Sequence, residues 1–178
     1  AFGALDYGHL MAFAVPDGLR RDARRRWLEF LTAQTSFGDP IPRVSAMTIG
    51  FGPDGLRRLG LDAGAGEEAL RRFPNAFLQG MGHPERSRIL DDVGESQPAK
   101  WRWGASQNPA DMIVVCYAKD KKLLATNVAE VKKRAKSAGL SPPVYELPLE
   151  TKRREQPKAR EDGDAKSGSR RPQAIEHF

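Results

Sequence analysis

The apolar run DMIVVCYA, from Asp111 to Ala118, constrains the fold more than any other part of the chain. Its length suits a strand, and its nearly continuous apolar character is typical of a strand that is buried on both faces or central in a sheet. Residues 119–138 follow with apolar side chains at a 4-3-4 spacing, which predicts a helix that ends at Gly139. The sequence therefore predicts a sheet with this helix as its packing partner.

Similar patterns predict the remaining strands and helices. Further strands are expected at 9–15, 44–51 and 143–149, and further helices at 19–34 and 67–77. The last strand contains Pro148, which cannot donate to a central ladder, so this strand belongs at an edge. The predicted fold class is α+β, a ferredoxin-like split βαββαβ arrangement. It has a four-stranded antiparallel sheet, helices on one face and a helical or loop insertion before the third strand.

The stretch from Phe77 to Gly104 lies within this insertion and has no clean helical or strand period. A long irregular connection inside a compact domain is uncommon, and it is usually functional or fixed against another part of the protein. The stretch contains arginines, an acidic pair and two tryptophans. Taken by itself, it is therefore a candidate active-site loop.

Length and charge predict one folded domain followed by a charged segment. The 178 residues include 39% hydrophobic residues, which suffices for one core. The net charge is +6, and basic residues outnumber acidic ones by eight to four between Thr151 and Pro172. A segment of that composition cannot bury enough apolar surface to fold. We therefore expect a ferredoxin-like domain over residues 1–150, a charged flexible linker or insertion over 151–172, and the start of a further segment over 173–178.

The sequence shows no feature of a membrane or secreted protein. No apolar run approaches the roughly 18 residues of a spanning helix. The first residues lack a basic region, an apolar stretch and a cleavage site in that order, which a signal peptide requires. The single cysteine, Cys116, lies in an apolar strand and forms no structural disulfide. The predicted location is cytoplasmic, without membrane contact.

Gly50, Gly52 and Gly55 spell a G-x-G-x-x-G pattern after a predicted strand. A dinucleotide site also needs a helix at this point and a second strand that ends in an acid about 20 residues later. Here Gly60 interrupts the helix after about one and a half turns, and no such strand follows. The pattern is therefore interpreted as a glycine-rich turn at a strand end.

The three histidines and the acidic pair do not form a recognisable reactive site. His9 begins a strand, His83 lies in a Gly/Pro loop and His177 is near the C-terminal end, so none has the walled apolar pocket of a haem ligand. Asp91 and Asp92 are adjacent and point apart, which favours a loop or cap pair over an acid/base pair. We therefore expect no catalytic, cofactor-binding or metal-binding residue in this chain.

Several segments, in this order, resemble one known family. They are TIGFGPDGLRRLGL, FLQGM, RSRILDDVG, Pro98 with Trp101-x-Trp103-Gly104, the strand that ends in Tyr117-Ala118, and Glu176-His177-Phe178. Together they resemble the N-terminal half of a dye-decolourising (DyP-type) haem peroxidase. The opening AFGALDYGHL resembles the family's first strand approach, although the usual Gln-Gly start is absent.

The resemblance implies two ferredoxin-like halves, with haem b bound largely by the C-terminal one. Relatives continue after Glu-His-Phe with Gly-Phe-x-Asp-Gly, whose Asp is the distal acid/base, and a proximal His and distal Arg come later. The 178 residues end at Phe178, so these residues have no counterpart among them. Within this resemblance, Trp101 and Trp103 are expected to point to one face of a short extended segment and to pack as core or interface anchors.

Two functions follow as hypotheses. The first is the N-terminal domain or a truncated form of a DyP-type peroxidase, inactive by itself, binding no haem tightly and partnered by the C-terminal haem domain or by further copies of itself. An exposed apolar patch is then expected where the other half docks. The alternative is a non-catalytic ferredoxin-like binding or assembly module with a basic tail. Nucleic acid is not the expected partner, because the RNA-recognition aromatic pattern is absent and the arginines of 19–34 suit a solvated helix face.

Overall fold

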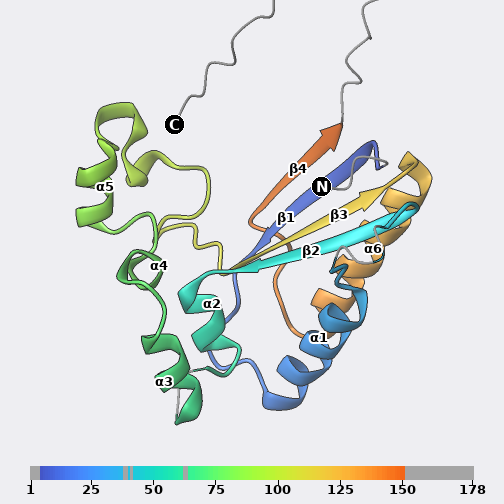
Figure 1. Cartoon of the computed structure of the whole chain (residues 1–178), viewed down its shortest axis with the longest axis horizontal. Helices are drawn as coiled ribbons and strands as arrows, with labels where there is room; N and C mark the ends of the chain where they lie inside the picture. The colour runs from blue at the N-terminus through green and yellow to red at the C-terminus, as the bar shows by residue number, and fades with distance from the viewer. Residues whose placement is uncertain (1–4, 38–39, 41, 62–63, 151–178) are drawn as a thin grey trace, which may run out of the picture.

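The computed structural model describes residues 5–37, 40, 42–61 and 64–150. The segments predicted at 151–172 and 173–178, His177 included, lie outside the described residues. Within the described ranges, the chain forms one sheet with two long helices on one side and a group of shorter helices at one end (Figure 1).

The strands are β1 (Tyr7–Phe13), β2 (Ser45–Phe51), β3 (Met112–Ala118) and β4 (Tyr145–Glu150). Their order in the sheet is β2-β3-β1-β4, and all neighbouring pairs are antiparallel. This confirms the predicted ferredoxin-like fold class. β3 is central, as its apolar sequence predicts, and Pro148 lies in the edge strand β4 opposite His9.

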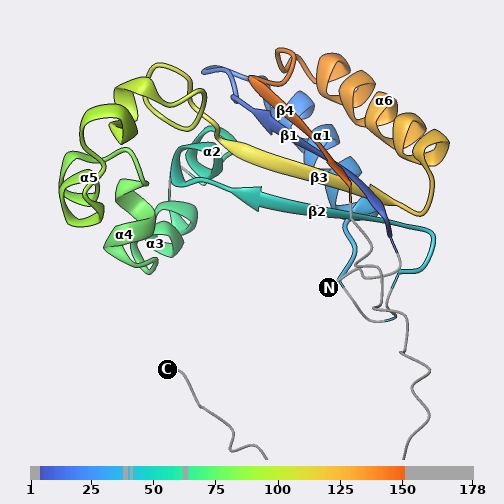
Figure 2. The same cartoon turned by 90° about the horizontal axis from the view of Figure 1, so that it is seen from above.

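Two long helices, α1 (Arg21–Gln34) and α6 (Lys121–Ser137), cover one face of the sheet (Figure 2). Each begins two residues after its predicted start, at 21 instead of 19 and at 121 instead of 119. The Asp120 side chain caps α6 by accepting the backbone N–H of Leu123 at 2.8 Å. Gly139 follows the helix with φ of +86°, a left-handed conformation that favours glycine.

The core lies between these two helices and the sheet. Alternate residues of β1 and β3 point toward the helices. They are Met11, Phe13, Met112, Val114 and Cys116, each at most 1% exposed. Trp27 of α1 completes this layer, with its ring in edge contact with the Phe13 ring at 6.2 Å between centroids. Burial raises the pKa of the Cys116 thiol to about 11, so this residue remains a neutral core side chain.

The insertion between β2 and β3 contains more helix than the sequence predicts. It consists of α2 (Pro53–Arg58), α3 (Ala65–Arg71), α4 (Asn75–Gln79), α5 (Pro84–Leu90) and two 3-10 turns, η1 (Gly94–Ser96) and η2 (Pro98–Lys100). The prediction of one helix over 67–77 is wrong, because Pro74 lacks an N–H and disfavours helical backbone in the residue before it. The stretch from Phe77 to Gly104 is not irregular throughout, since it contains α5, whose seven residues are too few to reveal a period.

Candidate functional site

The insertion is joined to the sheet by the carboxylate of Asp111, which directly precedes β3 and is 3% exposed. Its Oδ2 accepts the backbone N–H of Val15 at 2.6 Å and Nη1 of Arg58 at 2.6 Å. Nε of Arg58 also lies 2.9 Å from Oδ1 of Asp17. Partial burial lowers the pKa of Arg58. The hydrogen bond to Asp111 and the charges of both aspartates raise this pKa by more, so the guanidinium stays charged. These bonds fix α2 against the ends of β1 and β3.

Two glycines of the G-x-G-x-x-G pattern, Gly52 and Gly55, lie against the backbone of Asp111. The backbone N–H of Gly52 donates to the backbone carbonyl of Asp111 at 2.8 Å, so it is not free to hold a phosphate. Gly55 packs so closely that an added Cβ would overlap that carbonyl oxygen and lie 2.7 Å from its carbon. The helix that follows has only six residues. The pattern therefore reflects close backbone packing, in agreement with its interpretation as a turn.

A cavity of about 960 Å³ lies between this junction and the helices of the insertion. Much of its lining comes from the stretch Phe77 to Gly104, including the side chains of Phe77, Met81, Trp101 and Trp103. Its size is at the upper end of small-molecule sites, which span about 300–1,000 Å³. The sequence singled out this stretch but could not reveal the cavity, because residues 52–54 and 109–111 supply the opposite wall.

Trp101 and Trp103 are both half-buried and both line this cavity. The indole N–H of Trp101 donates to the backbone carbonyl of Ser96 at 2.7 Å. The ring of Trp103 stacks on Tyr145 of β4, with 5.5 Å between ring centroids. Neither tryptophan belongs to the main hydrophobic core, so of the two predicted alternatives, core or interface anchor, the structure does not support the first. Their role as interface anchors stays a prediction.

The two described histidines do not offer the geometry of a haem ligand. A ligating histidine binds iron through one ring nitrogen and donates the other N–H to a fixed acceptor. Nε2 of His9 lies 2.7 Å from Oε2 of Glu146, which would leave Nδ1 as the ligating atom, but His9 does not line the 960 Å³ cavity. Nδ1 of His83 accepts the backbone N–H of Glu85 at 3.3 Å and so caps α5. This nitrogen therefore cannot donate an N–H to a fixed acceptor, as a histidine that binds iron through Nε2 would. The described residues therefore do not fit axial ligation of haem.

The acidic pair forms a helix end, as predicted. Asp91 follows α5 in a left-handed conformation with φ of +57°, and the backbone N–H of Asp92 donates to the Ser87 carbonyl at 2.9 Å. Within the described ranges, no group of three or more His, Cys, Asp or Glu side chains is arranged to hold a metal. None of the described helices combines the length and apolar composition needed to cross a membrane. The absence of catalytic residues stays a prediction.

Glu146 of β4 connects the sheet edge to α6. Its Oε2 lies 2.7 Å from Nε2 of His9 and 2.8 Å from Nζ of Lys132. Burial raises the pKa of Glu146, but the hydrogen bonds and charges of Lys132 and His9 lower it more, so its pKa lies below the usual 4.5. A depressed carboxyl pKa contributes stability above the unfolded-state value, and this stability is lost as the pH falls through the folded-state value.

We expect Glu146→Gln to remove this acid-side dependence. Above about pH 5 the wild-type protein should have the larger free energy of unfolding, by less than about 1 kcal/mol because both partners are partly exposed. The difference should shrink below pH 4.5. Urea unfolding at several pH values measures it, and Lys132→Met should cause little further loss in the Glu146→Gln background. A difference that is constant down to pH 3 would exclude this account.

The sheet face opposite α1 and α6, termed the open face, is not covered by any described helix (Figure 2). One residue from each of the four strands contributes to a row across this face. In the order of the strands, these residues are Thr48, Val115, Leu10 and Leu147. The central pair, Leu10 and Val115, is half-buried, and Leu147 is 40% exposed. The three apolar side chains of this row, beside the polar Thr48, make the open face a candidate interaction surface. It agrees with the apolar patch expected from the sequence.

Comparison with solved structures finds this fold within larger proteins. A DyP-type peroxidase from Anabaena sp. has a TM-score of 0.62 at 15% identity, over 85% of this chain and 33% of that chain. A decolorizing peroxidase from Auricularia auricula-judae has a TM-score of 0.56 at 16% identity, over 85% and 31%. A dye-decolorizing peroxidase with an engineered heme pocket has a TM-score of 0.54 at 16% identity, over 82% and 30%. The chain therefore spans about a third of the length of these proteins.

No protein-family model and no curated protein matches the sequence. The resemblance to DyP-type peroxidases is confirmed for the fold, since the structural matches cover 85% of the chain. Identities of this size establish a shared fold and leave the function to be argued from the surface and the site.

Proposed function

We propose that this chain is the N-terminal ferredoxin-like domain of a DyP-type haem peroxidase, or a shortened form of one. In that role it supports a haem domain, and the peroxide-dependent oxidation of organic substrates belongs to the whole protein. Two observations support this proposal. The fold matches one part of several peroxidases, and the motifs from TIGFGPDGLRRLGL to Glu176-His177-Phe178 occur in the order expected of that family.

The observation that carries the proposal is the apolar open face. Leu10, Val115 and Leu147 form its central row, and packing another domain on this row would remove their side chains from water. The proposed occupant is the haem domain, because the matched peroxidases contain about two thirds of their length outside this fold. An interface between domains of one chain normally buries about 600–1,500 Å².

In the proposed arrangement, residues 1–150 form the supporting domain, 151–172 the linker and 173–178 the beginning of the haem domain. The haem would be held by residues outside this chain, since His83 lacks the geometry of a ligand and His9 does not line the large cavity. The chain's own contribution is to orient the haem domain and to exclude water from its covered side. A homo-oligomer formed through the open face is the competing arrangement.

The coding sequence beyond Phe178 provides the direct test. We expect it to encode Gly-Phe-x-Asp-Gly, and we expect the longer product to show a Soret band and peroxide-dependent turnover. The 178-residue chain should show neither. Strong haem binding by this chain alone would contradict the proposed division of labour. Tight, salt-dependent binding of a single-stranded oligonucleotide would favour the binding-module alternative instead.

Substitution on the open face tests the docking surface itself. Because the apolar row is exposed in the isolated chain, we expect self-association at high concentration, measured by light scattering. Val115→Lys should abolish this association and, in the longer product, should reduce the yield of haem-loaded protein. Ile89→Lys is the matched control, because Ile89 is 62% exposed on α5 and lies outside the open face. A wild-type chain that stays monomeric, or equal effects of both variants, would count against docking through this face.

A further inference from the structure

We propose that the cavity between the insertion and the Asp111 junction binds a planar aromatic ligand that carries no negative charge. The inference is independent of the proposed peroxidase role, because the cavity is formed wholly by described residues of this chain. The cavity has a volume of about 960 Å³. Its apolar walls come from Phe77, Met81, Trp101 and Trp103. Concave sites with aromatic walls and a few polar groups are the usual form of small-molecule sites.

The aromatic walls are held in place from outside the cavity. Trp101 is fixed by its 2.7 Å hydrogen bond to the Ser96 carbonyl, and Trp103 is fixed by its stacking on the tyrosine that begins β4. Phe77 stacks on Phe73 with 4.7 Å between ring centroids. Three rings that are already ordered lose little conformational freedom when a ligand binds, so this wall is preorganised for flat apolar surfaces.

Part of this apolar wall remains in contact with solvent. The side chain of Met81 is 53% exposed, and both indole rings are half-buried. A flat ligand between them would remove this surface from water, and the flexible thioether of Met81 could adapt to its shape. The wall therefore favours a planar aromatic ring system over a saturated one, since stacking adds to the gain from burial alone.

The charges of the lining decide the charge of the ligand. Two carboxylates, Asp54 and Asp111, belong to the lining, and no lysine or arginine is among its described residues. Each carboxylate forms an ion pair with an arginine outside the lining. Arg57 pairs with Asp54 at 2.6 Å, and Arg58 pairs with Asp111 at 2.6 Å. An anion in the cavity would find no lysine or arginine in the lining to pair with, because Arg57 and Arg58 lie outside the lining and are already paired with the two carboxylates. A neutral ring meets no such penalty, and a cationic ring gains from the faces of the indoles.

Two polar groups can hold the edge of the ligand. Nδ1 of His83 accepts the Glu85 N–H, so the neutral ring carries its hydrogen on Nε2 and can donate it. The hydroxyl of Ser106 has no hydrogen-bond partner among the described residues and also lines the cavity. Both groups favour an aromatic ligand that presents a ring nitrogen or oxygen as acceptor.

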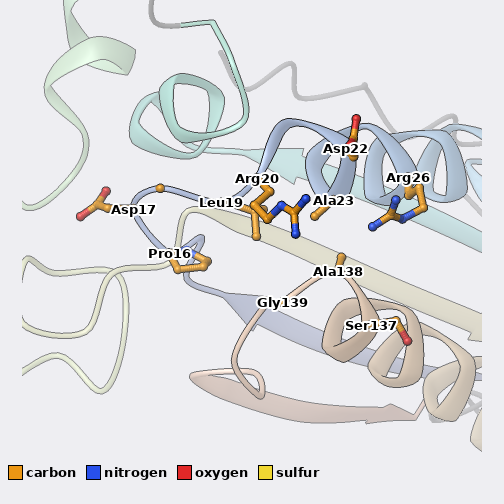
Figure 3. Close-up of a pocket in the computed structure, with 11 residues that line it drawn as sticks. Pro16, Asp17, Leu19, Arg20, Asp22, Ala23, Arg26, Ser137, Ala138 and Gly139 are labelled. Atoms are coloured by element: carbon orange, nitrogen blue, oxygen red, sulfur yellow. The ribbon is translucent and has the colours of Figure 1, made fainter.

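A second hollow, of about 450 Å³, differs from this cavity because no aromatic residue lines it. It lies between the beginning of α1 and the end of α6 (Figure 3). Arg20 and Arg26 turn their guanidinium groups toward the same space beside Ala23, while Asp17 and Asp22 belong to the same lining. This lining carries charges of both signs and no aromatic ring, so it lacks the stacking surface on which the proposal for the larger cavity depends.

Calorimetric titration of the 178-residue chain with a matched series of bicyclic compounds tests the proposal. We expect quinoline to bind because its ring nitrogen can accept a hydrogen bond, and we expect 1-methylquinolinium, which has no such acceptor, to bind through its attraction to the indole faces. Quinoline-6-carboxylate and the saturated analogue decahydroquinoline should bind at least about tenfold more weakly, because they lose the charge match or the stacking. Binding of the carboxylate as tight as that of the cation would overturn the proposal, as would no binding of either aromatic probe.

Variants assign the binding to this cavity. Trp103→Ala should weaken 1-methylquinolinium binding about tenfold, and Met81→Ala should weaken it about threefold. Ile89→Ala is the control, since Ile89 is an exposed apolar residue of the same insertion outside the lining, and it should leave the affinity unchanged. Circular dichroism checks that each variant is folded. If Trp103→Ala is unfolded, Trp103→Leu replaces it and should also weaken binding about tenfold, because leucine fills space but offers no ring for stacking. Unchanged affinity in the folded tryptophan and methionine variants would exclude this site.

Discussion

Gly55→Ala is expected to destabilise the protein by about 3 kcal/mol or more, at the upper end of overpacking substitutions. An added Cβ would overlap the backbone carbonyl oxygen of Asp111 and would lie 2.7 Å from its carbonyl carbon. That carbonyl cannot move away easily, because it accepts the N–H of Gly52 and directly precedes the central strand β3. Urea unfolding followed by circular dichroism measures the loss, and a failure to fold at 37 °C would be its extreme form.

The same glycine pattern provides the controls. An added Cβ at Gly50 would meet no atom within 4 Å, so Gly50→Ala should change stability by less than about 0.5 kcal/mol. At Gly52 the Cβ would lie 3.5 Å from the Asp111 carbonyl oxygen, an ordinary contact, so the effect there should be small. Equal losses at all three positions would show that local conformation, and not the approach to Asp111, determines the need for glycine.

Asp111→Ala is expected to cost roughly 2–4 kcal/mol. The substitution leaves the buried backbone N–H of Val15 without its acceptor and removes the partner of Arg58. The guanidinium side chain is 30% exposed and keeps Asp17, so part of the loss is recovered through water and the remaining pair. Asp111→Asn should retain part of the stability, because its amide oxygen can still accept the Val15 N–H.

Asp17→Ala is the matched control for this prediction. Asp17 binds the same guanidinium but is 88% exposed, so its removal should cost at most about 1 kcal/mol. Chemical denaturation of the three variants under one set of conditions separates the contributions. If Asp17→Ala destabilises the chain as much as Asp111→Ala, the junction depends on the ion pairs and not on the buried hydrogen bonds.

This junction also matters for the proposed functions. Asp111 belongs to the cavity lining, and its bonds fix α2 against the sheet. The opposite wall, with Trp103 stacked on Tyr145, is fixed to β4. A variant that loosens the junction should therefore weaken aromatic ligand binding even where the long helices keep their structure.

The sequence by itself determined the order and type of the main elements. The apolar run at 111–118 predicted a central strand, and the pattern that ends at Gly139 predicted the helix that follows it. Pro148 predicted that the last strand lies at an edge. The structure has all three features. This succeeded because a strand or helix with one buried face repeats that face every few residues, so the signal is local. The acidic pair could also be judged locally, from the end of α5 at which it lies, whereas the expectation that His9 begins a strand is wrong, because β1 begins at Tyr7.

Only the tertiary structure decided which distant residues meet. The ion pair between Asp111 and Arg58 spans 53 positions, and the contact between Asp111 and Val15 spans 96. No periodic pattern in the sequence indicates the short helices α4 and α5 or the cavity beside them. The same holds for the apolar row from Thr48 to Leu147. Their positions follow from packing between segments far apart in the chain, such as the close approach of Gly55 to the backbone of Asp111. The stretch Phe77 to Gly104 could thus be marked as unusual from sequence, but its two tryptophans became cavity walls only once the sheet was in place.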